Sequence, residues 1–314
     1  MSKILVTGGA GFIGSNICDF LINNNHQVVV LDNLSTGNKN NIEHLLNHPN
    51  FQFIYGDICN LEIVRKSCYG VNMICHQAAL GSVPRSINDP LSSHNSNVNG
   101  FLNILLVAKE LNIKRIVYAS SSSVYGDSEI LPKKEDEIGA QLSPYAITKY
   151  IDELYANNFS KLFGLECIGL RYFNVFGPRQ AKNDAYSAVI PVFVKSMLEN
   201  KSPVIYGDGN FSRDFTYIDN VVSANYLALT TNNEKCYGQV FNVACGGQIA
   251  IIHLFNSIKK HLNCIIDPIH AHIRKGDVPH SKANIQKIKE YLNYSVLVDF
   301  ETGIIKTIEY YKNI

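Results

Sequence analysis

The fold is decided by residues 3–14, which read KILVTGGAGFIG. The aliphatic and β-branched residues at the start of this stretch predict a buried strand, and the glycines that follow end the strand at once. Gly9, Gly11 and Gly14 fit the spacing G-x-G-x-x-G, and counted from Gly8 the stretch also fits G-x-x-G-x-x-G. Because glycine has no side chain, such a turn lets the backbone approach a pyrophosphate, whose charge the next helix N-terminus stabilises. The stretch therefore predicts a dinucleotide-binding turn between a strand and a helix.

The next expected strand, residues 27–32, ends in Asp32. This residue lies 18 positions beyond Gly14, close to the spacing of about 20 at which an acidic residue binds the ribose 2′-hydroxyl of a dinucleotide. A carboxylate in that place repels a 2′-phosphate, so Asp32 favours NAD over NADP. The alternative interpretation is a strand-end aspartate that only caps a turn.

Strand-like and helix-like segments alternate through the first half of the chain. The expected strands are residues 3–7, 27–32, 51–57, 73–76, 115–120 and 166–171, and the expected helices between them are 12–24, 42–46, 97–111 and 144–163. Such alternation predicts βαβ units and an α/β fold with a Rossmann-type doubly wound parallel sheet.

After Tyr172 the alternation breaks, and helices are expected at 188–199, 219–230 and 251–262. We therefore expect a NAD-binding Rossmann domain over residues 1–172, with a return near 216–245. A smaller α/β substrate-binding C-terminal domain is expected over 173–215 and 246–314, closing over a ligand at the carboxyl edge of the sheet.

Composition limits the classes of partner. The 314 residues are 46% hydrophobic and carry 28 Lys and Arg against 27 Asp and Glu, a formal net charge of +1. Such a chain buries a core, and without a concentrated basic patch no nucleic acid is expected as a partner. No apolar run reaches the ~18–20 residues that span a bilayer, so no membrane segment is expected. The eight cysteines are scattered singly, which favours reduced thiols, no metal site and a cytoplasmic location.

A second group of motifs indicates proton transfer. Residues 120–123 are four serines at the end of an expected strand, and residues 143–149 read SPYAITK. Pro144 suits a first helical turn, so Tyr145 and Lys149 are i and i+4 on one helix face. A free tyrosine has a pKa of about 10, and a neighbouring ammonium together with a positive nicotinamide ring favours its phenolate. A serine hydroxyl at the strand end would hold the reacting oxygen during the transfer.

With these motifs the chain resembles the extended short-chain dehydrogenase/reductase superfamily over essentially its whole length, and within it the NAD-dependent nucleotide-sugar epimerases. It is most similar to the bacterial enzymes that act on UDP-N-acetylhexosamines. The segments that carry the resemblance are residues 7–14, 56–58, 76–79, 82–86, 145–149, 171–174, 207–214 and 274–278. The resemblance implies reversible C4 epimerisation of UDP-N-acetylglucosamine to UDP-N-acetylgalactosamine on tightly bound NAD, with UDP-glucose as a further substrate and a role in polysaccharide biosynthesis.

The resemblance also implies roles for single residues. Tyr145 would be the catalytic base, and Lys149 its electrostatic partner and ribose anchor. Ser121 would lie beside the reacting sugar oxygen, a role that Ser123 shares because the serine run leaves the register open. The implied cofactor-binding residues are Gly8, Gly11, Phe12, Ile13, Gly14, Asp32, Asn33, Asp57, Ile58, Gln77, Ala78, Ala79, Asn97, Tyr145, Lys149 and Tyr172. The implied substrate contacts are Gly81, Ser82, Arg85, Ser121, Ser143, Asn174, Gln180, Val189, Tyr206, Arg213, Arg274, Asp277 and Ser281.

Other reactions of the same superfamily fit less well. A 4,6-dehydratase carries an Asp-Glu pair after the catalytic hydroxyl, whereas this chain has Ser122 and Ser123, neither of which titrates near neutrality. Nothing points to a dedicated decarboxylating site. A non-catalytic NAD-binding regulator would be expected to lose Tyr145, Lys149 or a glycine. A reductase that catalyses a net oxidation or reduction would bind and release its cofactor in every cycle, in contrast to the tightly bound NAD that the resemblance implies.

The sugar is constrained at its C2 substituent. In glucose-restricted relatives the position corresponding to Ser281 resembles a tyrosine that crowds C2, and a serine there leaves room for an N-acetyl group. The alternative for Ser281 is the N-cap of a helix over residues 283–292. Arg85 is open: near C6 it would accept a carboxylate, as in UDP-N-acetylglucosaminuronate, or it makes a structural ion pair.

A homodimer is expected as well. Relatives pair through the helices that correspond to residues 91–111 and 144–163, which form a four-helix interface. The first of these is more apolar than one buried stripe requires.

Overall fold

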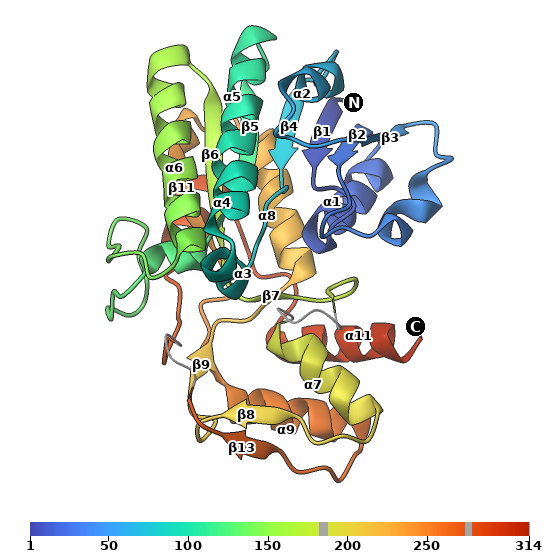
Figure 1. Ribbon diagram of the computed structural model, residues 1–314, viewed down its shortest axis with the longest axis vertical. Helices are drawn as coiled ribbons and strands as arrows, with labels where there is room; N and C mark the ends of the chain where they lie inside the picture. The colour runs from blue at the N-terminus through green and yellow to red at the C-terminus, as the bar shows by residue number, and fades with distance from the viewer. Residues whose placement is uncertain (182–187, 274–277, 314) are drawn as a thin grey trace.

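The computed structural model describes residues 1–181, 188–273 and 278–313. Its centre is a seven-stranded, all-parallel sheet in the order β11-β6-β5-β4-β1-β2-β3 (Figure 1). The strands are β1 (Lys3–Thr7), β2 (Gln27–Asp32), β3 (Phe51–Tyr55), β4 (Met73–His76), β5 (Arg115–Ser121), β6 (Glu166–Tyr172) and β11 (Gln239–Val243). The strand order reverses between β1 and β4, and in such sheets ligands bind outside the carboxyl ends of the strands at that reversal.

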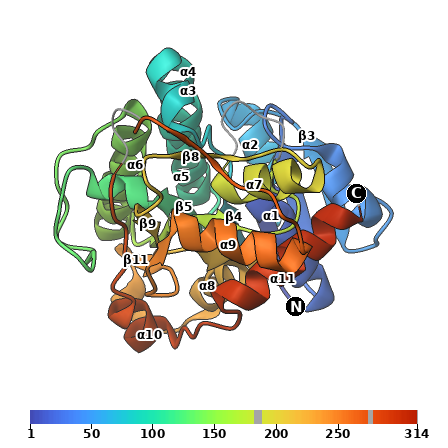
Figure 2. The same ribbon diagram turned by 90° about the horizontal axis from the view of Figure 1, so that it is seen from below.

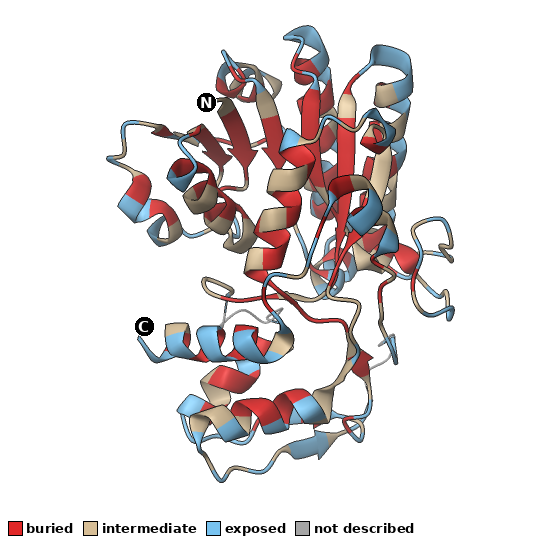
Figure 3. Ribbon diagram, turned by 180° about the vertical axis from the view of Figure 1, so that it is seen from behind, coloured by how far each residue is buried: buried red, intermediate tan, exposed pale blue. Residues whose placement is uncertain are grey.

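Helices cover both faces of the sheet. One face packs against α2 (Leu61–Ser67), α5 (Gly100–Glu110) and α6 (Pro144–Phe163), whose buried side chains form one core cluster with the strands. The other face packs against α1 (Phe12–Asn23) and α8 (Ile218–Thr230) in a larger cluster. The inner strands β1, β2, β4, β5 and β6 are accordingly buried along almost their whole length (Figure 3), as expected for a parallel sheet covered on both faces, and the edge strand β3 is only partly buried.

The remaining elements form a smaller layer beyond the carboxyl ends of the strands (Figures 1 and 2). Its helices are α7 (Val189–Leu198), α9 (Ile251–Leu262) and α11 (Phe300–Lys312), whereas α10 (Gln286–Leu292) packs against β11 and α8. Its strand pairs are β7 (Val175–Phe176) with β10 (Thr216–Tyr217), β8 (Val204–Tyr206) with β13 (Ile269–Ala271), and β9 (Ser212–Arg213) with β12 (Ile249–Ala250). Residues far apart in sequence therefore meet beyond the carboxyl ends of the strands. The chain then returns to the large sheet, where β11 pairs with β6.

The expected α/β fold is confirmed, and most differences are at segment ends. The third strand stops at Tyr55, and the fifth and sixth each run one residue longer than expected. The segment expected at 42–46 is a 3₁₀ turn, η1 (Lys39–Leu45). The helix expected from residue 97 begins earlier: α3 (Val83–Asn88) and α4 (Pro90–His94) precede a π turn, η2 (Asn95–Asn99), that runs into α5.

The alternative interpretation of Ser281 as a helix N-cap is wrong. Helix α10 begins at Gln286, and its N-cap position is Ile285. Ser281 instead donates its backbone N–H to Ser212 O at 3.0 Å, and this hydrogen bond holds the segment around Ser281 against β9. Among the described residues no helix is long and apolar enough to cross a membrane.

Candidate active site

The glycine turn after β1 is packed too closely for side chains. Gly8 has φ +69°, and a Cβ added there would lie 2.7 Å from the backbone nitrogen of Ala78. A Cβ at Gly14 would lie 2.2 Å from the carbonyl oxygen of Gly8. Helix α1 begins with Gly11 at its N-cap, which supplies no side-chain cap. The first N–H groups of α1 are therefore not covered by a cap, as a phosphate-binding helix start requires.

Asp32 both faces the cleft above this turn and holds the turn in place. Its carboxylate accepts the N–H of Ala10 at 2.9 Å and the N–H of Leu34 at 2.8 Å. Burial raises the pKa of Asp32, and these two hydrogen bonds oppose that rise. Asp32 therefore does cap the turn, as the alternative interpretation expected, and it also lines the cleft.

A first cleft of about 370 Å³ lies over the carboxyl ends of β1, β2 and β4. Most of the expected cofactor-binding residues line it: Gly8, Gly11, Phe12, Ile13, Gly14, Asp32, Asn33, Ile58, Gln77, Ala78 and Ala79. Four expected substrate contacts line it too, namely Gly81, Ser82, Arg85 and Gln180. Sequence reasoning missed Ser35, Thr36, Gly37 and Ser96, which also line it and lie in loops or turns without a motif.

A second cleft of about 510 Å³ lies in the smaller layer and shares Ala188 with the first. It collects four further expected substrate contacts, Asn174, Val189, Tyr206 and Arg213. Apolar side chains such as Phe215 complete its wall, so a flat ring and an anionic group would both find partners there. The expected contacts Arg274 and Asp277 lie outside the described residues.

Helix α6 presents the expected acid–base pair. Ser143 caps this helix by accepting the N–H of Ala146 at 3.2 Å. The Tyr145 N–H donates to Ser86 Oγ at 3.0 Å, one residue after the cleft-lining Arg85, so the start of α6 is fastened to the cleft wall. Lys149 is buried, and its Nζ donates to Ala119 O on β5 at 3.0 Å.

The serine run alternates between the core and the open end of β5. Ser120 donates to Glu153 Oε1 at 2.5 Å, so its hydroxyl is used inside the core. Ser121 Oγ accepts from both the N–H and the hydroxyl of Ser123, at 3.2 and 3.0 Å. The hydroxyls of Ser121 and Ser123 therefore lie within hydrogen-bond distance of each other. The sequence alone left open which of the two would lie beside the reacting sugar oxygen.

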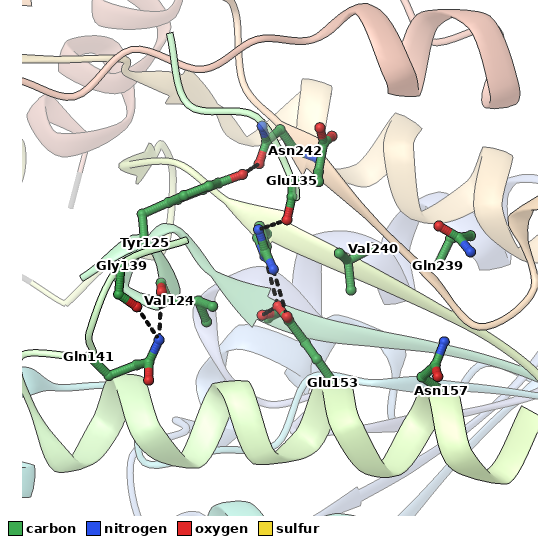
Figure 4. A network of polar contacts seen from close by, with 12 residues as sticks. Val124, Tyr125, Glu135, Gly139, Gln141, Glu153, Asn157, Gln239, Val240 and Asn242 are labelled. Atoms are coloured by element: carbon green, nitrogen blue, oxygen red, sulfur yellow. Dashed lines mark hydrogen bonds and ion pairs between the residues drawn. The ribbon is translucent and has the colours of Figure 1, made fainter. Parts of the chain in front are cut away.

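A buried ion pair fixes β5, β6 and α6 relative to one another. Arg171 on β6 donates to both carboxylate oxygens of Glu153, at 2.8 and 2.7 Å, and to Glu135 O at 2.9 Å. Nearby, Tyr125 donates to Asn242 at 2.6 Å on β11 (Figure 4). Arg171 is only 2% exposed, so this bidentate pair is desolvated and geometrically specific.

Gln77 is held at the cleft by a network that the sequence did not indicate. Its Nε2 donates to Asn225 Oδ1 at 3.1 Å, and Tyr172 donates to Gln77 Oε1 at 3.0 Å. Asn225, on α8, donates back to Tyr172 at 2.8 Å. Tyr172 thus supports a cleft residue and is not itself among the residues that line the cleft. Asn225 is 148 positions from Gln77, and no local motif marks it.

Seven other expected contacts also lie outside the two cleft linings among the described residues: Asp57, Asn97, Ser121, Ser143, Tyr145, Lys149 and Ser281. Asp57 accepts from Asn33 at 2.8 Å, which positions a cleft residue. Asn97 accepts the Leu80 N–H at 2.8 Å and so holds the loop after β4. The hydroxyl of Ser143 is engaged as the α6 cap, and Ser281 lies beside β9.

The chain is similar to known proteins in sequence and in fold. Residues 4–244 match the family model described as the NAD dependent epimerase/dehydratase family. The chain is 40% identical over 313 residues to a putative UDP-glucose 4-epimerase of Methanocaldococcus jannaschii, covering 99% of this chain and 98% of that protein. The chain belongs to this NAD-dependent epimerase/dehydratase family. It is a nucleotide-sugar epimerase of the extended short-chain dehydrogenase/reductase type.

Solved structures of this family are similar over nearly the whole epimerase chain. A UDP-N-acetylglucosamine 4-epimerase from Methanobrevibacter ruminantium, in complex with UDP-N-acetylmuramic acid, has a TM-score of 0.94 and 39% identity, covering 99% of this chain and 98% of that one. A UDP-glucose 4-epimerase from Thermotoga maritima, with UDP-glucose, has a TM-score of 0.93 and 35% identity, covering 99% of both chains.

NAD is the cofactor of the epimerase, and the first cleft fits it. The backbone contacts at Gly8 and Gly14 leave no space for side chains, as a pyrophosphate-binding turn requires. Asp32 stands at the end of β2 on the cleft wall, where it disfavours a 2′-phosphate. Gln77, Ala78 and Ala79 continue the cleft toward the residues that fasten α6.

Proposed function

We propose that the protein interconverts the C4 epimers of a UDP-N-acetylhexosamine, UDP-N-acetylglucosamine and UDP-N-acetylgalactosamine. One observation carries the proposal: the glycine-turn cleft and the second cleft share Ala188, and Ser86, next to the cleft-lining Arg85, holds the backbone of Tyr145. A cofactor in the first cleft and a nucleotide in the second would therefore place a sugar between them, beside α6.

Proton transfer at the sugar O4 is assigned to Tyr145. The phenolate accepts the O4 proton as the 4-keto sugar forms and returns it after the ring has turned over. Lys149 stabilises the phenolate by its positive charge and anchors the nicotinamide ribose. Ser121 donates a hydrogen bond to O4, and Ser123 shares the role by donating its own hydroxyl to Ser121 Oγ at 3.0 Å, which orients the Ser121 hydroxyl. When bound, NAD supplies the acceptor and then the donor of the C4 hydride.

The UDP moiety is assigned to the second cleft. Arg213 is the cation on its wall, and a guanidinium pairs well with diphosphate oxygens. Asn174, whose φ is +34°, donates to Asp214 O at 3.2 Å and so lies at a fixed position on the same wall. We assign Arg274 and Asp277 to the same nucleotide.

Ser281 is proposed to admit the N-acetyl group at C2, because a hydroxymethyl side chain replaces a phenol ring at that position. The Methanobrevibacter structure carries the name of a UDP-N-acetylglucosamine 4-epimerase, which supports this sugar, whereas the Thermotoga structure holds UDP-glucose. An open C2 pocket also accepts the smaller hydroxyl, since steric selection rejects large substituents more strongly than small ones.

A second candidate substrate is UDP-N-acetylglucosaminuronate. Arg85 lines the first cleft close to Ser82 and Gly81, where a sugar C6 carboxylate would meet a guanidinium. Turnover of the uronate that exceeds turnover of UDP-N-acetylglucosamine, and that falls selectively in Arg85→Met, would establish this candidate over the first.

The test of the sugar is proton NMR of the purified enzyme without added NAD. Parallel samples contain UDP-N-acetylglucosamine and UDP-glucose, and each is followed by the anomeric signal of its C4 epimer. We expect faster turnover of the N-acetylated sugar, and we expect Ser281→Tyr to reduce it at least tenfold while UDP-glucose turnover changes less. Equal loss for both sugars in Ser281→Tyr would remove the proposed C2 selection.

A homodimer through α4, α5 and α6 is proposed for the assembly. Apolar side chains are exposed along these helices, among them Leu91 at 69%, Leu106 at 42% and Leu154 at 53%. Light scattering at micromolar concentration should give twice the 35.0 kDa of one chain. Leu106→Glu with Leu154→Glu should give the mass of a monomer, and Ile265→Glu, at a side chain exposed elsewhere, should stay dimeric. A wild-type monomer would defeat the proposal.

A further inference from the structure

Asp152 is a buried carboxylate for which the proposed reaction has no use. It lies on α6, seven residues after Tyr145 and three after Lys149, and only 1% of its side chain is exposed. Its Oδ2 is 3.2 Å from Lys149 Nζ, and the Lys149 side chain is 2% exposed. Its Oδ1 has no hydrogen-bond partner among the described residues. A carboxylate is almost never buried to this degree unless it is paired, so the ion pair with Lys149 needs a physical explanation.

The ammonium of Lys149 is held from two sides. It donates to Ala119 O on β5 and to Asp152 Oδ2, at 3.0 and 3.2 Å. An ammonium has three N–H donors, so these two acceptors leave one donor directed elsewhere. Two fixed acceptors restrict a long, flexible side chain to one orientation, which leaves that third donor available to a ribose hydroxyl.

We propose that Asp152 is a positioning residue, which fixes the Lys149 ammonium by a buried ion pair and weakens the positive field that this ammonium exerts on Tyr145. The inference rests on the proposed roles of Tyr145 and Lys149. It adds a residue that sets the pH range in which the base of the reaction is ionised.

The other ionisable groups packed around the pair do not replace Asp152. Glu153, the neighbour on α6, is already engaged by Arg171 on β6 and by Ser120 on β5. His76 on β4 stays neutral, since burial and then the Lys149 charge lower its pKa to about 3. Burial raises the pKa of Tyr118 on β5, so this phenol stays protonated. Among the residues that the structure describes, Asp152 is thus the one acid in this environment that is paired with Lys149 and engaged by no other cation.

The charge of Asp152 itself changes close to neutrality. Burial raises the pKa of this carboxyl to about 7, and the charge of Lys149 opposes the rise. Below that pH the pair carries the full positive charge of Lys149, and above it the two charges cancel. The field at Tyr145 is therefore strongest where the phenol most needs help to ionise, which broadens the acid limb of the activity profile.

The expected size follows from the spacing on the helix. Seven residues at 1.5 Å per residue separate Asp152 and Tyr145 by about 10 Å along α6. At an effective dielectric constant of about 20, one charge at that distance shifts a pKa by about one unit. Because Asp152 itself titrates near pH 7, we expect Asp152→Asn to lower the midpoint of the acid limb by about half a unit to one unit. Because Asp152 is already largely protonated at pH 6, kcat/KM there changes little, and the ratio of kcat/KM at pH 8 to kcat/KM at pH 6 rises, by at most the factor of about three to ten that this shift represents.

Two readouts test this in the NAD-loaded enzyme. The first is the pH profile of kcat/KM for the epimerisation. The second is the ionisation of Tyr145, followed as the difference in phenolate absorbance between each protein and the same protein carrying Tyr145→Phe. Glu135→Gln is the matched control, because it removes a partly buried carboxylate near Arg171 and not near Lys149. Should Asp152→Asn fail to fold, Asp152→Ser removes the same charge with a smaller side chain.

The expected result is a lower midpoint in both readouts for the Asp152 variant and an unchanged midpoint for Glu135→Gln. Midpoints for the Asp152 variant within 0.2 pH units of wild type, about the error of such a titration, would overturn the inference. Full turnover by Tyr145→Phe would instead overturn the proposed function. An inactive Tyr145→Phe together with an unshifted Asp152→Asn would overturn this inference alone.

Discussion

The glycine turn gives the sharpest test of how this fold makes a cofactor site, and Gly14→Ala is the perturbation. The new Cβ would lie 2.2 Å from Gly8 O and 2.8 Å from Gly9 Cα, both backbone atoms that cannot rotate away. Restoring even a 3.0 Å contact requires the turn and α1 to move apart by about 0.8 Å (3.0 minus 2.2). Such a movement carries the first N–H groups of α1 away from the position of a pyrophosphate.

The magnitude follows from two opposed effects. Overpacking a close contact costs about 1–3 kcal/mol, and alanine in place of a helical glycine returns up to about 1 kcal/mol. The net loss of about 1–2 kcal/mol lowers Tm by about 2–8 °C for a chain of this size class. NAD affinity should fall at least tenfold, which corresponds to about 1.4 kcal/mol of misplaced phosphate contacts.

The assay is NAD released from the purified protein per chain, together with thermal unfolding. Gly247→Ala is the matched control, because a Cβ at Gly247 meets nothing within 4 Å. We expect wild type and Gly247→Ala to retain NAD and Gly14→Ala to lose it. Full NAD retention by Gly14→Ala with a Tm within one degree of wild type would refute the argument from backbone contact.

Three further predictions concern buried polar groups. Glu153→Gln leaves the Arg171 guanidinium without its charge partner and should cost about 3–5 kcal/mol in denaturant unfolding, whereas Glu110→Gln, at an exposed ion pair, should leave the midpoint unchanged; equal effects would contradict the role of burial. His76 has a folded-state pKa of about 3 against an ordinary 6.5, so the unfolded state binds more protons and stability falls as pH drops from about 6.5 toward 3. This His76 contribution should cost about 2 kcal/mol at pH 5 relative to pH 7, and His76→Asn should lose less than wild type over that interval; identical losses would count against a neutral buried imidazole. Asn225→Ala removes one partner of Gln77 and the amide that donates to Tyr172, and it should cost about 1–3 kcal/mol and weaken NAD retention; unchanged retention would mean that this network does not position the cleft.

Local patterns predicted the central fold well because its elements have strong local causes. Continuous aliphatic runs ended by glycine or aspartate predicted β1 and β2, and a proline after a capping serine marked the first residue of α6. The short strands of the smaller layer were missed, because pairs of two or three residues are held by long-range contacts and leave no period in the sequence.

The candidate site was predictable where a motif requires a backbone conformation. Gly8 and Gly14 are constrained by contacts that any side chain would violate, so their spacing carries the information. Asp152 and Asn225 were missed because their importance comes from partners that the fold brings together. The helix expected after Ser281 started too early, since Ile285 is the residue at which the chain turns into α10.

The central claim is that C4 is inverted by hydride removal and return within the enzyme, with Tyr145 handling only the O4 proton. The most direct measurement is turnover of UDP-N-acetylglucosamine in D₂O by enzyme purified without added NAD, with the C4 position of the product read by NMR and mass spectrometry. The account predicts the C4 epimer with protium retained at C4 and no epimer from Tyr145→Phe. Deuterium at C4 of the product would contradict it, because the hydrogen would then have exchanged with solvent.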